Sequence, residues 1–467
     1  MELFKNLFST RNMIKDNTAL GEIPPSRKAY GTSLRIALPS VIEMTSFALI
    51  SMMSAAMVGS LGPEYMAAVG LTSQPRMIFL ALIFALNVGV TAVVARRKGQ
   101  EDRKGARLTL RQGILISFAI GFTMSALTFI LARPIMSLAG AESDTIELAS
   151  SYFRIVSAGL VINALTMTIS AAQRGIGNTR VTLVVNGAAN VASFLFHFLL
   201  IDGRWFFPRL GIRGAAIAML ISGLVGLVLA IASILKKDAY LKVSRKDSWR
   251  PHKATLHSIA KVGGNSVFEQ ICVRVGFFVY AIVVASLGTA AFATHHIAMQ
   301  MMHLSFTFAD GIAVATTALV GQNLGRDRPD LSMMYGKIGQ RMAFVVSIFL
   351  VTFAVLARNW FPTIFTEDPY IIQSAAALFL IMAAILPFQT SQLIMAGSLR
   401  GSGDTRYVAF TMLITVALVR PLMAILMVFG LGLGLQGAWY AIILDQALRL
   451  VLLYSRFARG KWTKIKL

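Results

Sequence analysis

The stretch RGIGNTR at residues 174–180 returns as RGSGDTR at residues 400–406, 226 positions further along the chain. Each copy lies between two long apolar runs. A glycine-rich basic stretch can bind phosphate, but a loop of the Walker type needs a Lys-Ser/Thr pair that is missing here. We therefore interpret both copies as turns at equivalent places of a duplicated fold. In this interpretation Gly175 and Gly401 adopt the left-handed conformation that ends a helix.

Other matches repeat the same spacing along the chain. They pair Ser60-Leu61-Gly62 with Ser286-Leu287-Gly288, Thr91 with Thr317, and Glu43 with Glu269, each 226 positions apart. Further on, Gly214-Ala215 returns as Gly437-Ala438 at an offset of 223, which needs only a three-residue deletion. The chain is therefore expected to consist of two homologous halves.

The composition indicates a membrane protein. The chain is 56% hydrophobic and 14% charged, whereas soluble proteins carry about a quarter charged residues. Runs long enough to span a bilayer as helices, about 20 residues each, fall at 34–59, 66–95, 108–132, 146–172, 181–201, 212–235, 256–285, 292–324, 335–357, 371–398, 407–430 and 437–457. We predict an all-α integral membrane protein with twelve transmembrane helices in two six-helix lobes. Because six is even, the lobes are parallel repeats, an arrangement that transporters use.

The short loops indicate which side of the membrane each faces. Segments 96–107 and 236–253 are strongly basic, whereas 134–147 and 359–370 contain no Lys or Arg. Basic loops stay in the cytoplasm, so both termini are expected there, in a multi-pass protein of the cytoplasmic (inner) membrane. Loop 202–211, with two arginines, is the exception. The net charge of +23 resides in such loops and does not indicate nucleic-acid binding.

These patterns divide the chain into five segments. We expect a cytoplasmic N-terminal segment at 1–33, an N-terminal lobe at 34–235, a basic cytoplasmic linker at 236–255, a C-terminal lobe at 256–460 and a basic cytoplasmic tail at 461–467. Both RGxGxTR turns then face the cytoplasm. Their arginines are expected to anchor at the headgroup level.

Several motifs occur in a characteristic order between about Ser33 and Trp462. They include LPSVIEM, MVGSLG, AAVGLTSQP, both RGxGxTR turns, LGIRGAAIA, FEQICVRVG, VASLG, ALVGQNLG and GAWYAIILDQALR. In this order and spacing the chain resembles the multidrug and toxic compound extrusion (MATE) family, within the multidrug/oligosaccharidyl-lipid/polysaccharide flippase superfamily. The resemblance implies a V-shaped pair of six-helix lobes and export of organic, often cationic, compounds driven by Na⁺ or H⁺. It implies neither an enzyme nor a cofactor.

The resemblance also points to residues that couple transport to an ion. Glu269 matches the seventh-span Glu of the sodium-coupled subgroup. Ser54 stands where many members have a first-span Asp, and Gln389 stands where some have a tenth-span Asp. His197 falls near a fifth-span position that is often Asn or Asp. Coupling is therefore expected to depend mainly on the C-terminal lobe, with a possible Na⁺ at Glu269 and no other metal.

Acidic residues within spans are rare and expensive, and they usually face a cavity or the bundle interior. Glu43, Glu269 and Asp310 are the candidates for ion coupling. The alternative for each is a buried acid held by structural hydrogen bonds. Asp310 in particular has a structural alternative as the partner of Arg274. Asp445 and Arg449, four residues apart, are interpreted as a pair within one helix.

Neutral polar residues supply the candidates for a substrate cavity. These are Gln389, Gln392, Asn190, His197 and Ser54. A histidine in a helix is more often a packing residue than a proton relay, and this alternative stays open for His197.

Two functional hypotheses remain at this stage, and a third is excluded. The preferred one is a monomeric secondary antiporter that exports cationic or amphipathic drug-like compounds in exchange for Na⁺ or H⁺ by alternating access, with lipid and small organic molecules as its partners. The second is a flippase or exporter of a lipid-linked or natural-product precursor. A membrane-embedded prenyl transferase would need aspartate-rich motifs that the spans do not contain.

Overall fold

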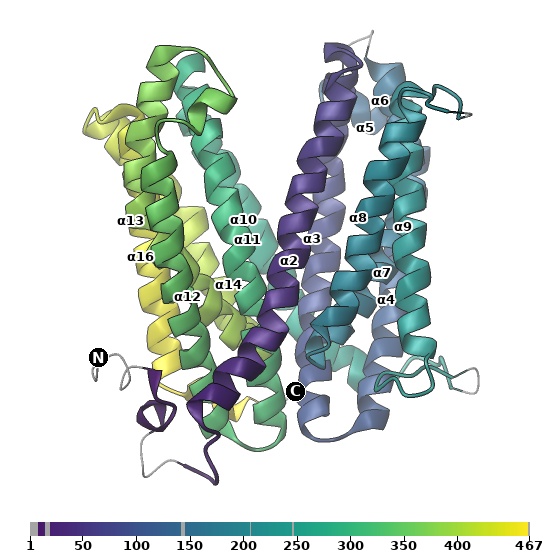
Figure 1. The fold of residues 1–467 in the computed structure, drawn as a ribbon, viewed down its shortest axis with the longest axis vertical. Helices are drawn as coiled ribbons and strands as arrows, with labels where there is room; N and C mark the ends of the chain where they lie inside the picture. Colours follow the sequence, from purple (N-terminus) through teal and green to yellow (C-terminus); the bar gives the residue numbers. More distant parts are fainter. Residues whose placement is uncertain (1–7, 15–18, 142–144, 206, 245–246, 466–467) are drawn as a thin grey trace. The chain divides into compact units, whose positions relative to one another are not determined.

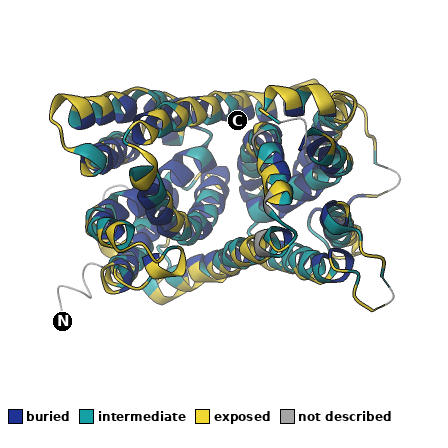
Figure 2. Ribbon diagram, turned by 90° about the horizontal axis from the view of Figure 1, so that it is seen from above, coloured by how far each residue is buried: buried dark blue, intermediate teal, exposed yellow. Residues whose placement is uncertain are grey.

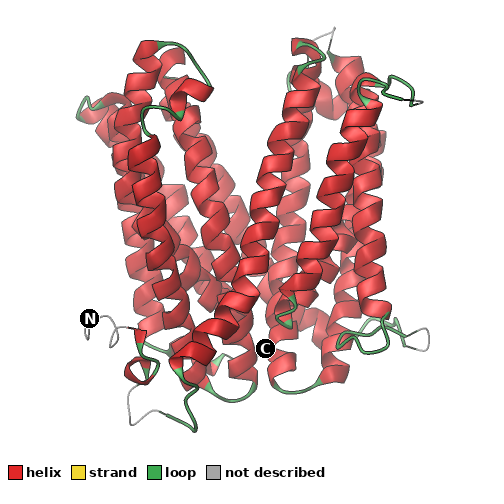
Figure 3. Ribbon diagram, viewed as in Figure 1, coloured by secondary structure: helices red, strands yellow, loops and turns green. Residues whose placement is uncertain are grey.

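In a computed structural model the described part of the chain, residues 8–14, 19–141, 145–205, 207–244 and 247–465, is helical wherever it is regular (Figure 3). It forms two compact units. One consists of Ile42–Gly263, and the other of Met1–Val41 together with Gly264–Leu467. Within each unit long helices run side by side (Figure 1).

Ten of the described helices are long and apolar enough to cross a membrane. In the first half of the chain these are α2 (Ser26–Gly59), α3 (Pro63–Gly99), α4 (Arg103–Ile130), α8 (Thr179–Leu200) and α9 (Gly211–Leu235). In the second half they are α10 (Lys253–Ala285), α11 (Thr289–Gly325), α12 (Pro329–Ala357), α13 (Pro369–Ser402) and the run Thr405–Gly430.

Two further elements complete the predicted twelve. Helices α6 (Ile146–Ala158) and α7 (Leu160–Gly175) form one broken span, bent by 41°. The last predicted span corresponds to α16 (Gly434–Ala458), which carries Asp445 and Arg449 in its middle and is therefore less apolar. The duplicated twelve-span, all-α fold predicted from the sequence is confirmed.

The span Thr405–Gly430 is not one regular α-helix. It consists of α14 (Thr405–Met412), the π-helical turn η4 (Leu413–Val419), α15 (Arg420–Ile425) and a second π-helical turn, η5 (Leu426–Gly430). Short π-helical turns within helices are frequently found at functional sites. Here the two turns flank the short helix that begins at Arg420.

The helices pack through apolar faces inside each unit. Along them buried and exposed residues lie on different faces (Figure 2). In the unit Ile42–Gly263, one apolar core joins α3, α4 and α7 and includes Val90, Leu110 and Ile169. In the other unit, Trp439 of α16 is fully buried against residues of α10, α11 and α13.

The boundaries of the compact units differ from the predicted segments, because both fall inside a continuous helix. Ile36 and Ala37, in the first half of α2, belong to the core of the unit that contains Gly264–Leu467. Conversely, Ile259 near the start of α10 belongs to the core of the other unit. The predicted linker packs in the same unit as the start of α10, since Leu241 is buried in that same core. No break in the apolar pattern marks these positions.

The two RGxGxTR turns occupy equivalent places, but the second glycine of each motif, and not the first as predicted, has the left-handed conformation. The left-handed residues are Gly177 (φ 82°) and Gly403 (φ 90°). Gly175 instead ends α7 in close contact with α3, where a Cβ atom would lie 2.8 Å from the carbonyl oxygen of Thr91. A Cβ atom on Gly401 would collide in the same way with the carbonyl oxygen of Thr317. The first glycine of each motif therefore serves close helix packing.

The contacts that fix these helices are duplicated as well. The hydroxyl of Thr91 donates to the carbonyl oxygen of Ala171 at 3.1 Å. The hydroxyl of Thr317 donates to the carbonyl oxygen of Gly397 at 2.9 Å. Both members of the second pair lie 226 positions after those of the first. The repeat read from the sequence is thus a repeat of specific tertiary contacts.

Candidate functional site

A buried carboxylate on α10 meets an arginine from the second RGxGxTR turn. Glu269 is 2% exposed, and both its carboxylate oxygens accept hydrogen bonds from the Arg400 guanidinium at the end of α13. The Arg400 side chain is itself 21% exposed. A charged hydrogen bond of this kind compensates part of the cost of burying the carboxylate.

Asp310 of α11 adds a second carboxylate to this ion pair. It is half-buried, and its electrostatic partner is Arg400. The sequence had suggested Arg274 as that partner. Arg400 thus forms an ion pair with Glu269 and interacts electrostatically with Asp310, and this cluster of Glu269, Asp310 and Arg400 has an excess of one negative charge when all three groups are ionised. A cluster of that kind attracts a cation.

The other unit contains the equivalent acid in a different environment. Glu43 of α2 is 7% exposed and lies 3.5 Å from Arg174. Its two oxygens also accept hydrogen bonds of 2.7 Å from the Thr182 hydroxyl and from the Asn186 amide, both on α8. Glu43 thus has one cation and two neutral donors, and no second acid is recorded with it among the described residues.

The two ion pairs are related by the internal repeat. Glu43 with Arg174 and Glu269 with Arg400 are each separated by 131 positions along the chain. The prediction that the motif arginines anchor at the headgroups is therefore wrong for Arg174 and Arg400, which point to the acids instead. The sequence is consistent with this pairing, because the acid and the arginine both recur after 226 positions.

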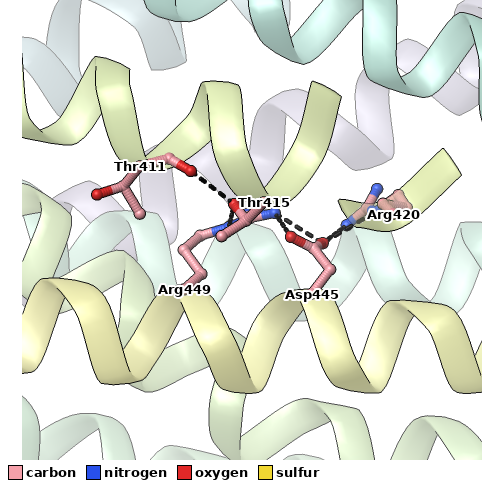
Figure 4. A network of polar contacts seen from close by, with 5 residues as sticks. All are labelled: Thr411, Thr415, Arg420, Asp445 and Arg449. Carbon is pink, nitrogen blue, oxygen red and sulfur yellow. Dashed lines mark hydrogen bonds and ion pairs between the residues drawn. The ribbon is translucent and has the colours of Figure 1, made fainter. Parts of the chain in front are cut away.

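A second charged cluster lies in the unit that contains Glu269, where Asp445 and Arg449 of α16 meet Arg420 of α15 (Figure 4). The Asp445 carboxylate accepts hydrogen bonds from Arg449 of the same helix, as predicted, and also from Arg420 at 2.9 Å. Arg449 further donates to the Thr415 hydroxyl at 3.2 Å. Arg420 lies 4.6 Å from the ring centroid of Phe277. All three charged groups are buried, and together they carry one excess positive charge.

The net charges of the two clusters are opposite, since the cluster of Glu269 has one excess negative charge and the cluster of Asp445 has one excess positive charge. Arg449 is close enough to Glu269 to interact electrostatically with it. Binding a cation at Glu269 or Asp310 therefore changes the balance of a connected set of charges. This arrangement can link ion binding to a rearrangement of the helices that carry it.

Next to Arg420 lies a group of aromatic side chains, since its guanidinium is 5.9 Å from the ring centroid of Tyr280. The ring of His295 is 5.7 Å from those of Tyr280 and Trp439. All three side chains are buried. Within the described residues, His295 Nδ1, the Tyr280 hydroxyl and Trp439 Nε1 make no hydrogen bond.

The amides predicted to line a cavity lie on α13. Gln389 is fully buried and donates to the Ser305 hydroxyl of α11 at 3.1 Å. Gln392, one turn further on, is also buried, and its amide atoms have no hydrogen-bond partner in the described part of the chain. The structure places both near α11 and shows no contact of either with Glu269.

The three candidates in the other unit do not converge on Glu43. His197 lies eleven residues beyond Asn186 on α8, about 16 Å along the helix axis at 1.5 Å per residue. Its Nδ1 lies 2.7 Å from the Ser193 carbonyl oxygen, which favours the packing interpretation. Asn190 is half-buried, and no described residue accepts from its Nδ2. Ser54 is half-buried on α2.

The fold and these buried charges define the class of protein. Spanning helices arranged as a parallel duplication, with ionisable groups paired inside them, characterise an integral membrane transporter. The MatE family model matches twice, at residues 39–199 and 266–426, once in each half. The chain belongs to the MatE family, so it is a transporter and not an enzyme.

Curated relatives agree with this assignment over nearly the whole length. The chain is 29% identical over 453 residues to the Thermotoga maritima protein named "Probable multidrug resistance protein NorM", covering 97% of both chains. It is 26% identical to multidrug resistance protein PmpM of Pseudomonas aeruginosa, covering 91% of both. It is also 26% identical to the uncharacterized transporter YisQ of Bacillus subtilis, covering 91% of this chain and 93% of that one.

Solved structures share the fold at lower identity. One is an outward-facing multidrug resistance MATE family transporter of the MOP superfamily, with a TM-score of 0.85, 22% identity, and coverage of 93% of this chain and 97% of that one. Another is a MOP superfamily transporter from Pyrococcus furiosus, described as having a binding pocket of reverse polarity, with a TM-score of 0.87, 22% identity and coverage of 94% and 97%.

Proposed function

We propose that this transporter exports organic compounds from the cytoplasm in exchange for Na⁺ or H⁺, by alternating access. The observation that carries this proposal is the cluster of Glu269, Asp310 and Arg400, in which one guanidinium is paired with Glu269 and also interacts electrostatically with Asp310. One Na⁺ or one proton would neutralise its excess charge. Carboxylate oxygens are suitable ligands for a hard cation.

The C-terminal cluster suits coupling better than Glu43 does. Glu43 already accepts two short hydrogen bonds from neutral donors besides its contact with Arg174. These contacts occupy both oxygens of the Glu43 carboxylate without a further cation. We propose that Glu269 with Asp310 binds the coupling ion and that Glu43 contributes mainly to structure.

The substrates proposed are cationic or amphipathic drug-like molecules, since relatives from two organisms are named multidrug resistance proteins. Gln392 and Asn190, whose amide groups keep unused hydrogen-bonding capacity among the described residues, are proposed to line the substrate path, with Gln389, His197 and Ser54. A flippase for a diphosphate-linked lipid would need free cations inside the spans. Arg420 and Arg449 are instead paired with Asp445, which favours the export proposal.

We further propose that the protein works as a monomer in the cytoplasmic membrane, with both termini in the cytoplasm. The basic character of alternate loops supports this orientation of the termini. Cysteine probes at Gly140 and Asp238, in a Cys272→Ser background, are expected to label from opposite sides. Labelling of both probes by an impermeant reagent added outside would contradict the orientation.

Transport itself is tested with the purified protein in sealed vesicles loaded with a fluorescent cationic drug. Na⁺ and pH gradients are imposed separately. We expect one of the two gradients to drive drug movement and its collapse to stop that movement. Equal fluxes with and without both gradients would refute ion-coupled export.

A further inference from the structure

The unit that contains Gly264–Leu467 has a cavity apart from the residues proposed for ion coupling and for the substrate path. Its volume is about 540 Å³. It lies where α10, α14 and α16 meet, and it includes the last residues of the second RGxGxTR motif. Its lining includes Phe268, Asp404, Arg406, Tyr407, Phe410 and Arg456.

One end of this cavity is charged. Arg456 donates to the Asp404 carboxylate at 2.7 Å and lies 5.1 Å from the ring centroid of Tyr407. Arg406 is exposed, and its guanidinium makes no hydrogen bond or ion pair with any described residue. Two arginines and one aspartate leave one positive charge, located on the unpaired Arg406. A guanidinium with free donors is suited to bidentate binding of a phosphate.

The other end of the cavity is apolar and belongs to the membrane. Phe268 and Phe410 are 47% and 56% exposed, and both lie in helices long and apolar enough to span a bilayer. Phe410 is four residues from Arg406, so the two side chains share one face of α14. Since Arg406 is the second residue of that span, the charged end lies at the membrane interface and the aromatic end lies deeper. This holds for either orientation of the protein.

The internal repeat shows that this combination is particular to one half of the chain. Arg180 is the equivalent of Arg406 and is also exposed. Asn178 stands in place of Asp404 and Val184 in place of Phe410. The aspartate and the phenylalanine of the lining are therefore absent at these equivalent positions, although the arginine is kept. Arg180 provides a matched control for Arg406.

We propose that this cavity binds the headgroup of an anionic phospholipid. Arg406 pairs with the phosphate, and Phe268 and Phe410 contact the acyl chains. Basic pockets between spanning helices are known to hold anionic headgroups. A soluble phosphate ester offers the same charge but has no use for the two exposed phenylalanines. The lipid is therefore the occupant that accounts for both ends of the cavity.

The test measures lipid binding by the intact purified protein in detergent, by native mass spectrometry. Phosphatidylglycerol is compared with phosphatidylcholine of the same acyl chains, and glycerol 3-phosphate is added as a competitor. We expect phosphatidylglycerol to bind at least about tenfold more tightly than phosphatidylcholine, and Arg406→Gln to weaken it by about the same factor. Arg180→Gln is expected to leave binding unchanged.

Further comparisons separate the lipid from a soluble phosphate ester and from misfolding. Phe410→Ala should weaken phosphatidylglycerol binding while Arg406 is still present. Glycerol 3-phosphate should compete poorly. Because Arg406 has no partner in the described chain, Arg406→Gln should match the wild type in melting temperature and elution volume in lipid-free detergent. Equal effects of Arg406→Gln and Arg180→Gln, equal binding of both lipids, or effective competition by glycerol 3-phosphate would each overturn the proposal.

Discussion

Removing Arg400 tests whether it neutralises two acids at once. In Arg400→Gln, Glu269 stays buried with its side chain 3% exposed, and Asp310 loses its electrostatic partner as well. Breaking a buried ion pair on one side costs about 3–5 kcal/mol. Because the Arg400 side chain is 21% exposed, solvent screens part of this loss. We expect a destabilisation of about 2–3 kcal/mol at neutral pH.

The matched variant in the other unit is Arg174→Gln. Glu43 keeps its 2.7 Å hydrogen bonds from Thr182 and Asn186, and its contact with Arg174 is long, at 3.5 Å. The expected loss is therefore that of a single weak interaction, about 1 kcal/mol or less.

Both variants are compared by thermal unfolding in detergent, followed by tryptophan fluorescence. In a domain of 150–250 residues each kcal/mol shifts the melting temperature by about 2–4 °C. Arg400→Gln should therefore melt roughly 4–12 °C lower and Arg174→Gln at most about 4 °C lower. Adding Glu269→Gln to Arg400→Gln should recover part of the loss, because one stranded acid is removed. Equal shifts for the two arginine variants, or strictly additive effects in the double variant, would refute the reasoning.

Two further substitutions test the helix packing at Gly401 and the buried ion pairs of Asp445. Gly401→Ala should destabilise the protein by about 1–3 kcal/mol, since its Cβ atom meets the Thr317 backbone. The control is Gly187→Ala in α8, because the space around Gly187 is open. Similar melting temperatures for the two variants would contradict the packing argument. Asp445→Asn leaves Arg420 and Arg449 buried without a counter-charge, a loss of about 3–5 kcal/mol. We expect little monodisperse protein by size-exclusion chromatography, and wild-type yield and melting temperature would disprove a structural role for Asp445.

The duplicated helical fold was predictable because long apolar runs and a constant offset are properties of the sequence alone. The acids could also be found, since charged residues in such runs are few. Their partners could not be read from local patterns. Arg174 and Arg400 stand at helix ends, where arginine usually faces headgroups, and each meets an acid 131 positions away only through tertiary packing.

The glycine roles show the same limit. Both glycines of RGIGNTR can adopt a left-handed conformation, so the sequence does not decide between Gly175 and Gly177. The approach of Thr91 on α3 decides it, because only glycine fits at position 175. The boundaries of the compact units lie inside α2 and α10 for a related reason. The apolar pattern of a helix indicates that the helix is buried, but it does not indicate which unit the helix packs against.

The measurement that tests ion coupling most directly is drug export by Glu269→Gln in sealed vesicles, beside the wild type and Glu43→Gln. Glutamine keeps the size and hydrogen-bonding capacity of Glu269 and removes its charge and titration. We expect Glu269→Gln to bind the drug but to lose gradient-driven export, whereas Glu43→Gln should show a milder defect. Export by Glu269→Gln at the wild-type rate, under both Na⁺ and pH gradients, would contradict this expectation.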